Sequence, residues 1–250
     1  MKIVLIGSVN VAYHLSKAFT ASNVPIHSLF ARNTAALEEI SSATGIPVSY
    51  DLPKADLYIL AVADGAIEEV SLQIQKTDAL VAHTSGSLPM QVLKGNYRKA
   101  SFYPMQTFSK KRQLDYSRIP FFVEAENNVD ENILVEMASK ISSTVHRSTH
   151  EERKYLHLTA VFTCNFVNHL FTIGKDISEA HHIPFDVFYP LIEETVAKMK
   201  TMNPKDAQTG PAVRGDAKVM ALHQQLIKDQ NQLEIYRTLS QSILEMHAKK

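Results

Sequence analysis

Near its start the chain reads Lys2-Ile3-Val4-Leu5-Ile6-Gly7-Ser8-Val9-Asn10-Val11-Ala12, and this stretch decides the fold. An apolar run ends in Gly7 and leads into a segment with apolar residues at helical spacing. A strand, a tight turn and a helix N-terminus in this order are typical of sites that hold a dinucleotide pyrophosphate on free backbone N–H groups. The stretch therefore predicts a Rossmann-like, doubly wound α/β fold.

The spacing of small residues in this turn departs from the usual G-x-G-x-x-G/A pattern at one position. Gly7 fills the first position and Ala12 the third, but Val9 stands at the second. Glycine at that position lets the phosphate approach the backbone, so we expect the fold to be kept and cofactor affinity to be weakened. The predicted pyrophosphate-binding residues are Gly7, Ser8, Val9, Asn10, Val11 and Ala12.

Composition limits the range of partners and locations. The 250 residues carry no formal net charge, so no overall attraction to nucleic acid or to an anionic membrane is expected. The apolar runs stay below the ~18 residues that suggest a membrane span, and the first strand is too short for a signal sequence. The one cysteine, Cys164, fits a reducing compartment. We expect a cytoplasmic protein.

The chain changes its periodicity near residue 150. Short apolar runs alternate with helical segments before that point, which favours parallel βαβ units, with strands of mixed direction after Ser101. The expected strands are Lys2–Gly7, Ile26–Ala31, Leu57–Val62, Leu80–His83, Ala100–Tyr103, Phe121–Glu124 and Thr144–His146. The expected domains are a Rossmann-like dinucleotide-binding domain over 1–149 and an all-α substrate and dimerisation domain over 150–250.

The second half shows helical periodicity only. The expected helices are Tyr155–Gly174, Asp186–Met202, Asp216–Ile227 and Asn231–Met246. The apolar faces of these helices exceed what a small bundle covers by itself, which predicts a homodimer through the helical domain. The segment Leu158–Ile173 is apolar nearly all round and is expected to be buried.

The end of the second strand bears on the choice of nucleotide. An acidic residue about 20 positions after the glycines commonly binds the ribose of NAD, but this chain has Arg32, Asn33 and Thr34 there. A guanidinium beside amide and hydroxyl groups suits a 2′-phosphate. The segment thus favours NADP over NAD; the alternative is a solvated arginine in a loop.

Polar residues follow the next two strands, where open α/β sheets bind ligands. Ala63 comes after one of them, and His83-Thr84-Ser85 ends the other. We expect Ala63 and Thr84 to contact the cofactor, and His83 and Ser85 to be catalytic. The alternative for this segment is a helix cap. Ser85 has no visible aspartate partner in the sequence, so a hydrolase triad is not expected.

Further candidates are polar residues in apolar surroundings. Gln106 follows the strand that ends near Tyr103 and could line a pocket beside Phe108. Asn165, Asn168, His169 and Thr172 share one helix face. That face is either a structural hydrogen-bond network or a stripe facing substrate, which would make Asn165 and Asn168 catalytic and His169 substrate-binding.

The loop before the third expected helix contains Arg214, which can bind a carboxylate or pair with Asp216. The histidines His146, His150, His181 and His182 lack metal-site spacing. They are interpreted as surface residues, and no metal site is expected.

Several of these segments together resemble one group of proteins. They are Asn10-Val11-Ala12, His83-Thr84-Ser85-Gly86, Phe102–Phe108, Ala160–His169 and, most specifically, Gln208-Thr209-Gly210-Pro211-Ala212-Val213-Arg214-Gly215-Asp216. The chain resembles bacterial proteins classed as NADP oxidoreductases, with a Rossmann domain like that of F420-dependent oxidoreductases and a helical C-terminal domain of the DUF2520 type.

More distantly it is similar to pyrroline-5-carboxylate reductase and to the 6-phosphogluconate and β-hydroxyacid dehydrogenases. That likeness implies a helical domain that dimerises and helps to form the substrate site, with Asn165 and Asn168 as candidate catalytic residues. The hypothesis is an NADP(H)-dependent oxidoreductase acting on a small polar metabolite with a C=O or C=N group. The alternatives are a non-catalytic binding or regulatory protein with a weakened nucleotide site, and a reductase that uses F420.

Overall fold

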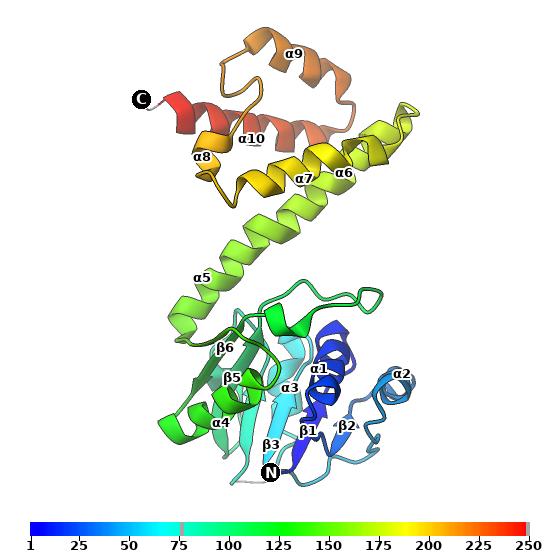
Figure 1. Ribbon diagram of the computed structural model, residues 1–250, viewed down its shortest axis with the longest axis vertical. Coiled ribbons are helices and arrows are strands. Elements are labelled where there is room, and N and C mark those ends of the chain that lie inside the picture. The colour runs from blue at the N-terminus through cyan, green and yellow to red at the C-terminus, as the bar shows by residue number, and fades with distance from the viewer. Residues whose placement is uncertain (76–77, 249–250) are drawn as a thin grey trace. The chain divides into compact units, whose positions relative to one another are not determined.

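The computed structural model describes residues 1–75 and 78–248 (Figure 1). The chain divides into two compact units, Met1–Asn165 and Phe166–Lys250. The expected boundary at 149/150 coincides with the start of helix α5 (His150–Ala160), whereas the division into compact units follows that helix and the π-helical turn η4 (Val161–Asn165). The last two residues of the expected second domain lie outside the described range.

The first unit is built on one seven-stranded sheet, as far as the described residues show. Its strands are β1 (Ile3–Ile6), β2 (Ser28–Phe30), β3 (Leu57–Leu60), β4 (Leu80–His83), β5 (Arg98–Pro104), β6 (Phe121–Ala125) and β7 (Val145–Arg147). They lie in the order β2-β1-β3-β4-β5-β6-β7, and every neighbouring pair is parallel except the antiparallel β5 and β6. The predicted Rossmann-like α/β fold with late strands of mixed direction is confirmed.

Helices cover both faces of this sheet, because successive residues of each strand point to opposite sides. Ile3 and Leu5 of β1 pack with α1 (Asn10–Ala21), α2 (Thr34–Thr44) and α4 (Asn128–Ser139). Val4 and Ile6 pack on the other side with α3 (Ile67–Ser71) and the turn before β5. The carboxyl ends of β1, β3, β4 and β5 consequently lie at one edge, where the loops that follow them gather.

The second unit contains helices and no strand among its described residues. They are α6 (Phe166–Ala180), the short 3₁₀ helix η5 (Phe185–Phe188), α7 (Tyr189–Lys198), α8 (Pro204–Ala207), α9 (Ala217–Leu226) and α10 (Gln230–Ala248). The predicted all-helical second part is confirmed. In the described helices, none has the length and apolar character needed to cross a membrane.

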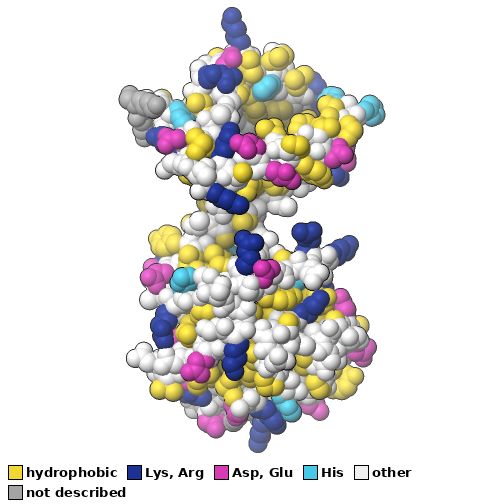
Figure 2. Space-filling view, viewed as in Figure 1, with side chains coloured by type: hydrophobic (Ala, Val, Ile, Leu, Met, Phe, Trp, Pro, Cys, Tyr) yellow, Lys and Arg dark blue, Asp and Glu magenta, His cyan; other side chains and the backbone are white. Residues whose placement is uncertain are grey.

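The expectation of a buried helix over Leu158–Ile173 is wrong for the single chain. The exposed fractions of Leu158, Phe162 and Phe166 are 49%, 61% and 50%. Hydrophobic side chains reach the surface of the helical unit (Figure 2). The segment is apolar on more sides than its own unit covers, so Asn165, Asn168, His169 and Thr172 share a face that is open rather than enclosed.

Candidate functional site

The turn after β1 needs glycine at its first position for a reason that lies in the neighbouring strand. Gly7 has a φ of +132°, and a Cβ atom built on it would lie 2.0 Å from the carbonyl oxygen of Ala61, just after β3. Its N–H donates a 2.9 Å hydrogen bond to the carbonyl of Phe30. Gly7 therefore allows the ends of β1, β2 and β3 to lie close together at this turn.

Val9 adopts a backbone conformation that suits valine. Its φ is −81° and its ψ is 178°, and its side chain is 43% exposed at the N-terminus of α1. No side chain of the described residues caps this helix, so its first N–H groups are available to an anion and the helix dipole favours negative charge there. The donor set of this turn fits a pyrophosphate group.

A pocket of about 260 Å³ lies over this turn. It is lined by six of the predicted cofactor-binding residues: Gly7, Ser8, Val9, Arg32, Asn33 and Ala63. Asn10, Val11, Ala12, Thr34 and Thr84 lie outside its lining. The volume is slightly below the usual range of ligand pockets, so it would enclose part of a dinucleotide.

Arg32 stands at the exposed rim of the pocket. Its Nη1 lies 3.1 Å from Oε1 of Glu69, and the two side chains are 72% and 62% exposed. An ion pair this exposed contributes little free energy, so a phosphate can replace the carboxylate. Asn33 caps α2 by accepting a 3.1 Å hydrogen bond from the N–H of Ala36, and Thr34 is the first residue of that helix.

Asn10 and Ala12, both in α1, contact other parts of the first unit. The Asn10 side-chain amide donates a 2.9 Å hydrogen bond to the carbonyl of Phe108, which ties the helix start to the loop after β5. Ala12 is fully buried, and Val11 packs against the core on the same side of the sheet. Thr84 is buried as well, and its hydroxyl donates to the carbonyl of Leu60 at 3.2 Å.

His83 is enclosed in the sheet rather than exposed at its edge. Its side chain is fully buried, and its Nδ1 accepts a 3.1 Å hydrogen bond from the N–H of Ser85. Burial, together with the positive charge of Arg153, lowers the pKa of His83 to about 3. The ring is therefore neutral at physiological pH, and its buried Nε2 has no hydrogen-bond partner among the described residues.

Ser85 has an aspartate partner that the sequence did not reveal, and the expectation that it has none is wrong. Its hydroxyl donates a 2.9 Å hydrogen bond to Oδ2 of Asp64, in the 3₁₀ turn η1 (Asp64–Ala66) after β3. The Ser85 hydroxyl oxygen in turn accepts bonds of 3.1 Å from the N–H groups of Ser87 and Leu88. Because His83 contacts the amide of Ser85 and not its hydroxyl, the geometry is that of a capped turn, not of a hydrolase triad.

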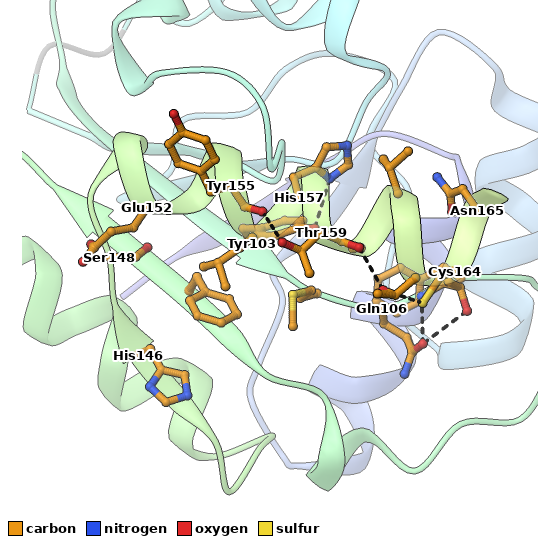
Figure 3. Close-up of a pocket in the computed structure, with 18 of the residues that line it drawn as sticks. Tyr103, Gln106, His146, Ser148, Glu152, Tyr155, His157, Thr159, Cys164 and Asn165 are labelled. Carbon is orange, nitrogen blue, oxygen red and sulfur yellow. Dashed lines mark hydrogen bonds between the residues drawn. The ribbon is translucent and has the colours of Figure 1, made fainter. Parts of the chain in front are cut away.

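A larger pocket of about 990 Å³ lies beside the end of β5, the loop after it and helix α5 (Figure 3). Gln106 and Asn165 line it, as does Cys164. The side-chain oxygen of Gln106 is held by the N–H of Thr107 at 2.7 Å. Val161, Thr163, Cys164 and Asn165 reach the pocket from the π-helical turn η4; π turns of this kind are frequent at functional sites.

Tyr103 and His157 form a hydrogen-bonded pair in this larger pocket. The Tyr103 hydroxyl lies 3.2 Å from Nδ1 of His157 (Figure 3). Burial, and next the negative charge of Asp64, raise the pKa of Tyr103. Neither residue was proposed from the sequence as catalytic; the available signal was the position of Tyr103 at the carboxyl end of a strand.

Helix α5 is held against the sheet by a buried ion pair. Nη1 of the fully buried Arg153 lies 2.5 Å from Oε2 of Glu124, and its Nη2 donates to the carbonyl of Leu88 at 2.9 Å. His150 is partly exposed, and its Nε2 hydrogen-bonds the carbonyl of Ser87 at 3.0 Å. These contacts fix the position of α5 against the sheet, and with it the position of His157, which lies one turn further along the same helix.

The remaining predicted residues lie in the second unit. Asn168 is exposed, and its carbonyl accepts a hydrogen bond from Thr172. His169 lines a pocket of about 440 Å³ between α6 and α10. Arg214 is exposed, and the described ion pairs do not include one with Asp216, whose carboxylate caps α9 through the N–H of Val219 at 3.1 Å.

No group of three or more histidine, cysteine or acidic side chains suited to a metal ion is found over the described residues. His146 is exposed and stacks on Phe122 with 5.2 Å between ring centroids. His181 and His182 are exposed.

The comparisons with known proteins agree with this architecture. A protein of Bacteroides fragilis, provisionally named an NADP oxidoreductase, is 40% identical, with 98% of each chain covered and a TM-score of 0.92. A Thermotoga maritima protein is 20% identical over 99% of this chain and all of its own, with a TM-score of 0.82. Pyrroline-5-carboxylate reductase of Coxiella burnetii, 15% identical over 99% and 97% of the two chains with a TM-score of 0.54, shares the fold.

No curated protein sequence matches the chain. The family model described as a domain of unknown function, DUF2520, matches residues 119–243, which is half of the sequence. Together with the 40% identity to the Bacteroides fragilis protein over nearly the whole length, this match shows that the chain belongs to the DUF2520 family.

Proposed function

We propose that this protein is an NADP(H)-dependent oxidoreductase that acts on a small polar metabolite with a C=O or C=N group. One observation carries the proposal: the turn Gly7–Val9, which leads into the uncapped start of α1, lines the same pocket as Arg32, although the two follow different strands. A pyrophosphate and a 2′-phosphate are the anions that these two features suit. The provisional name of the 40% identical Bacteroides fragilis protein supports the same activity.

The residues present fit the dinucleotide. The N–H groups after Gly7 would bind the pyrophosphate, while Arg32 and Asn33 would bind the phosphate-bearing ribose. When bound, the nicotinamide would supply two electrons and one hydrogen to the substrate carbon, because that chemistry belongs to the cofactor. The task of the protein is to bind and orient the substrate and to move a proton.

The predicted substrate-contacting residues occur in both units. Within the first unit, Gln106 and Asn165 line the larger pocket and are proposed to orient the substrate. In the helical unit, Asn168 is proposed as a catalytic residue, and His169 and Arg214 are proposed as substrate-binding residues. We further propose a cytoplasmic homodimer that does not bind nucleic acid, in keeping with the zero net charge and the single cysteine.

A non-catalytic Rossmann-type binding or regulatory protein with a weakened nucleotide site is the second candidate. Its support is Val9, whose half-exposed side chain lines the pocket where phosphate would approach. Thermal unfolding of the pure protein with NADPH, NADH and F420 separates these functions, since a ligand that binds the folded state raises the midpoint in a saturable way. A rise of the unfolding midpoint that needs the lowest concentration with NADPH supports the NADP(H)-dependent oxidoreductase. A rise with F420 only indicates a reductase that uses this deazaflavin. No rise with any of the three would contradict the proposal.

A further inference from the structure

Space around the Tyr103–His157 pair depends on a glycine. A Cβ atom built on Gly86 would lie 2.8 Å from Cζ of Tyr103 and 2.8 Å from Nδ1 of His157. The chain after β4 thus passes directly against the two groups that share the hydrogen bond. A residue with a side chain at position 86 would push the pair apart, so the backbone there is shaped to the pair.

The strand order places this pair on the nicotinamide side of the proposed nucleotide. Arg32 follows β2, the phosphate-binding turn follows β1, and Tyr103 lies near the end of β5. The order is β2-β1-β3-β4-β5, so Arg32 and Tyr103 lie on opposite sides of the turn. With roughly 4.8 Å between neighbouring strands, three steps separate β1 from β5 by about 14 Å. A dinucleotide whose 2′-phosphate is at Arg32 therefore extends toward Tyr103.

The charged residues of the larger pocket are already engaged with other groups. Arg147 donates to Glu131 at 2.6 Å and to Asn132 at 2.5 Å. Glu152 closes the capping box of α5 by accepting from the N–H of Thr149 at 2.8 Å. Much of the remaining wall is apolar or aromatic, including Phe108, Phe122, Leu156 and Val161. A pocket of this kind favours an uncharged ligand with an apolar body.

From these contacts we infer that Tyr103 is the proton donor of the reaction, that His157 relays protons to it, and that the substrate is an uncharged ketone, aldehyde or imine with an apolar body. This inference rests on the proposed oxidoreductase function and assigns to it a less polar substrate than the small polar metabolite proposed above. Tyr103 is assigned as the catalytic residue, because it lines the pocket and its hydroxyl is the group hydrogen-bonded to His157. His157 is a positioning residue, because it acts through Tyr103.

The step balances as follows for a ketone. A bound reduced nicotinamide would supply two electrons and one hydrogen to the carbonyl carbon, so that the π-electron pair of the C=O bond would move to oxygen. That oxygen forms a bond to the hydroxyl proton of Tyr103 as the O–H bond of Tyr103 breaks. The phenolate takes the proton on Nδ1 of His157, and the half-exposed His157 regains a proton at Nε2 from water. The net proton comes from solvent.

The electrostatics agree with a group that holds its proton until needed. Burial of Tyr103 and the nearby Asp64 carboxylate raise its pKa, while the positive charge of Arg153 opposes them. The hydroxyl is consequently neutral at physiological pH. It can donate to an oxygen that gains negative charge in the transition state, which is the role of a general acid.

The test uses acetophenone labelled with ¹³C at its carbonyl as the probe, and the full-length protein with and without NADP⁺. A hydrogen bond from Tyr103 polarises the carbonyl, so its resonance in the bound state is expected to lie downfield of that in Tyr103→Phe. Loss of this neutral hydrogen bond should weaken binding roughly fivefold. Tyr155→Phe is the matched control, because Tyr155 lines the same pocket and is 62% exposed; it should leave both values unchanged.

The relay is tested on protein labelled with ¹³C at the tyrosine Cζ position. The Tyr103 resonance is expected to move in His157→Gln, because the hydrogen bond between its hydroxyl and Nδ1 of His157 is lost. The Tyr155 resonance should be the same in both proteins. A Tyr103 resonance unaffected by His157→Gln would exclude the relay.

Tyr103 is not the proton donor if acetophenone at millimolar concentration fails to bind, or if Tyr103→Phe and Tyr155→Phe have equal effects. Thermal unfolding with NADPH is measured on the same proteins and depends on the other pocket. A Tyr103-dependent shift without NADPH stabilisation would uphold the ketone site and reject the cofactor. NADPH stabilisation without that shift would reject the proton donor alone.

Discussion

The hydroxyl of Ser85 donates a 2.9 Å hydrogen bond to Oδ2 of Asp64, and this contact joins the segment after β4 to the turn after β3. The same hydroxyl accepts the N–H groups of Ser87 and Leu88. Every hydrogen-bonding position of this oxygen is therefore occupied by the protein itself. These hydrogen bonds of Ser85 hold the shape of the loop that passes Tyr103 and His157.

Ser85→Ala should lower the free energy of unfolding by about 1–3 kcal/mol, because two backbone N–H groups lose their acceptor in a largely buried place. Urea unfolding measures this change. Ser87→Ala is the control, since the Ser87 side chain is exposed; it should change stability by under about 0.5 kcal/mol. A stable Ser85→Ala protein would show that the loop does not depend on this hydroxyl.

Arg32→Ala should weaken NADPH binding by about one to two decades and leave NADH binding nearly unchanged. A charge-assisted hydrogen bond to the 2′-phosphate contributes about 1.5–3 kcal/mol. Glu69→Gln is the matched change, because it releases Arg32 from its ion pair; it should strengthen NADPH binding slightly. Calorimetric titration at one salt concentration measures all three proteins. Equal losses for both nucleotides in Arg32→Ala would contradict the assignment.

Val9→Gly should strengthen NADPH binding about tenfold, the effect of roughly 1.4 kcal/mol. The valine side chain lines the phosphate pocket, and glycine accepts the φ of −81° without strain. Val9→Ala removes the two methyl groups and keeps the Cβ atom, so it should give an NADPH affinity between those of the parent and Val9→Gly. If all three proteins bind NADPH equally well in the same titration, Val9 does not obstruct the phosphate.

Acid should destabilise the fold through His83. The pKa of this buried ring is lowered from 6.5 to about 3, so below pH 6.5 the unfolded chain binds a proton that the folded protein does not. Stability is full above pH 6.5 and falls by up to about 1.4 kcal/mol per pH unit until the pH approaches 3. The urea midpoint as a function of pH measures this slope.

His83→Gln should flatten that slope, whatever its effect on stability at pH 7. His181→Gln, at an exposed position of the helical unit, should keep the slope of the parent. A slope that is the same in all three proteins would mean that His83 is not the group responsible.

The apolar surface of the helical unit predicts a dimer in solution. Leu170 is 38% exposed on α6, and Leu239 and Met246 are 44% and 49% exposed on α10. Light scattering at micromolar concentration should give twice the chain mass of 28.0 kDa. Leu170→Glu should shift the mass toward one chain, whereas Leu72→Glu, at a 60% exposed leucine of the first unit, should not. A monomer mass for the parent protein would contradict the dimer.

The α/β part could be predicted closely because its signals are local. The run Leu80–His83 is a strand with the expected bounds, and Gly7 ends the first strand at the turn that requires a positive φ. Arg32 and Val9 are predicted as nucleotide-site residues from their distance to that turn, and both line the pocket above it. Each of these inferences depends on residues close together in the sequence.

The contacts of the larger pocket could not be predicted in this way. Tyr103 and His157 are 54 residues apart, and Ser85 and Asp64 are 21 apart. The order of the strands and the buried Arg153–Glu124 pair bring them together. The exposure of Phe162 was likewise not foreseen, because hydrophobicity indicates that a side chain needs cover but not which surface supplies it.

The sequence by itself determined the Rossmann-like sheet, the helical second part and the position of the glycine turn after β1, since hydrophobic period and turn residues act over a few positions. Only the tertiary structure decided that the His83 ring is buried, that the Ser85 hydroxyl is bonded within a turn, and that Tyr103 lines the larger pocket beside His157. The physical reason is that the pKa, burial and partners of a side chain are set by elements distant in the chain, which meet only when the sheet has formed.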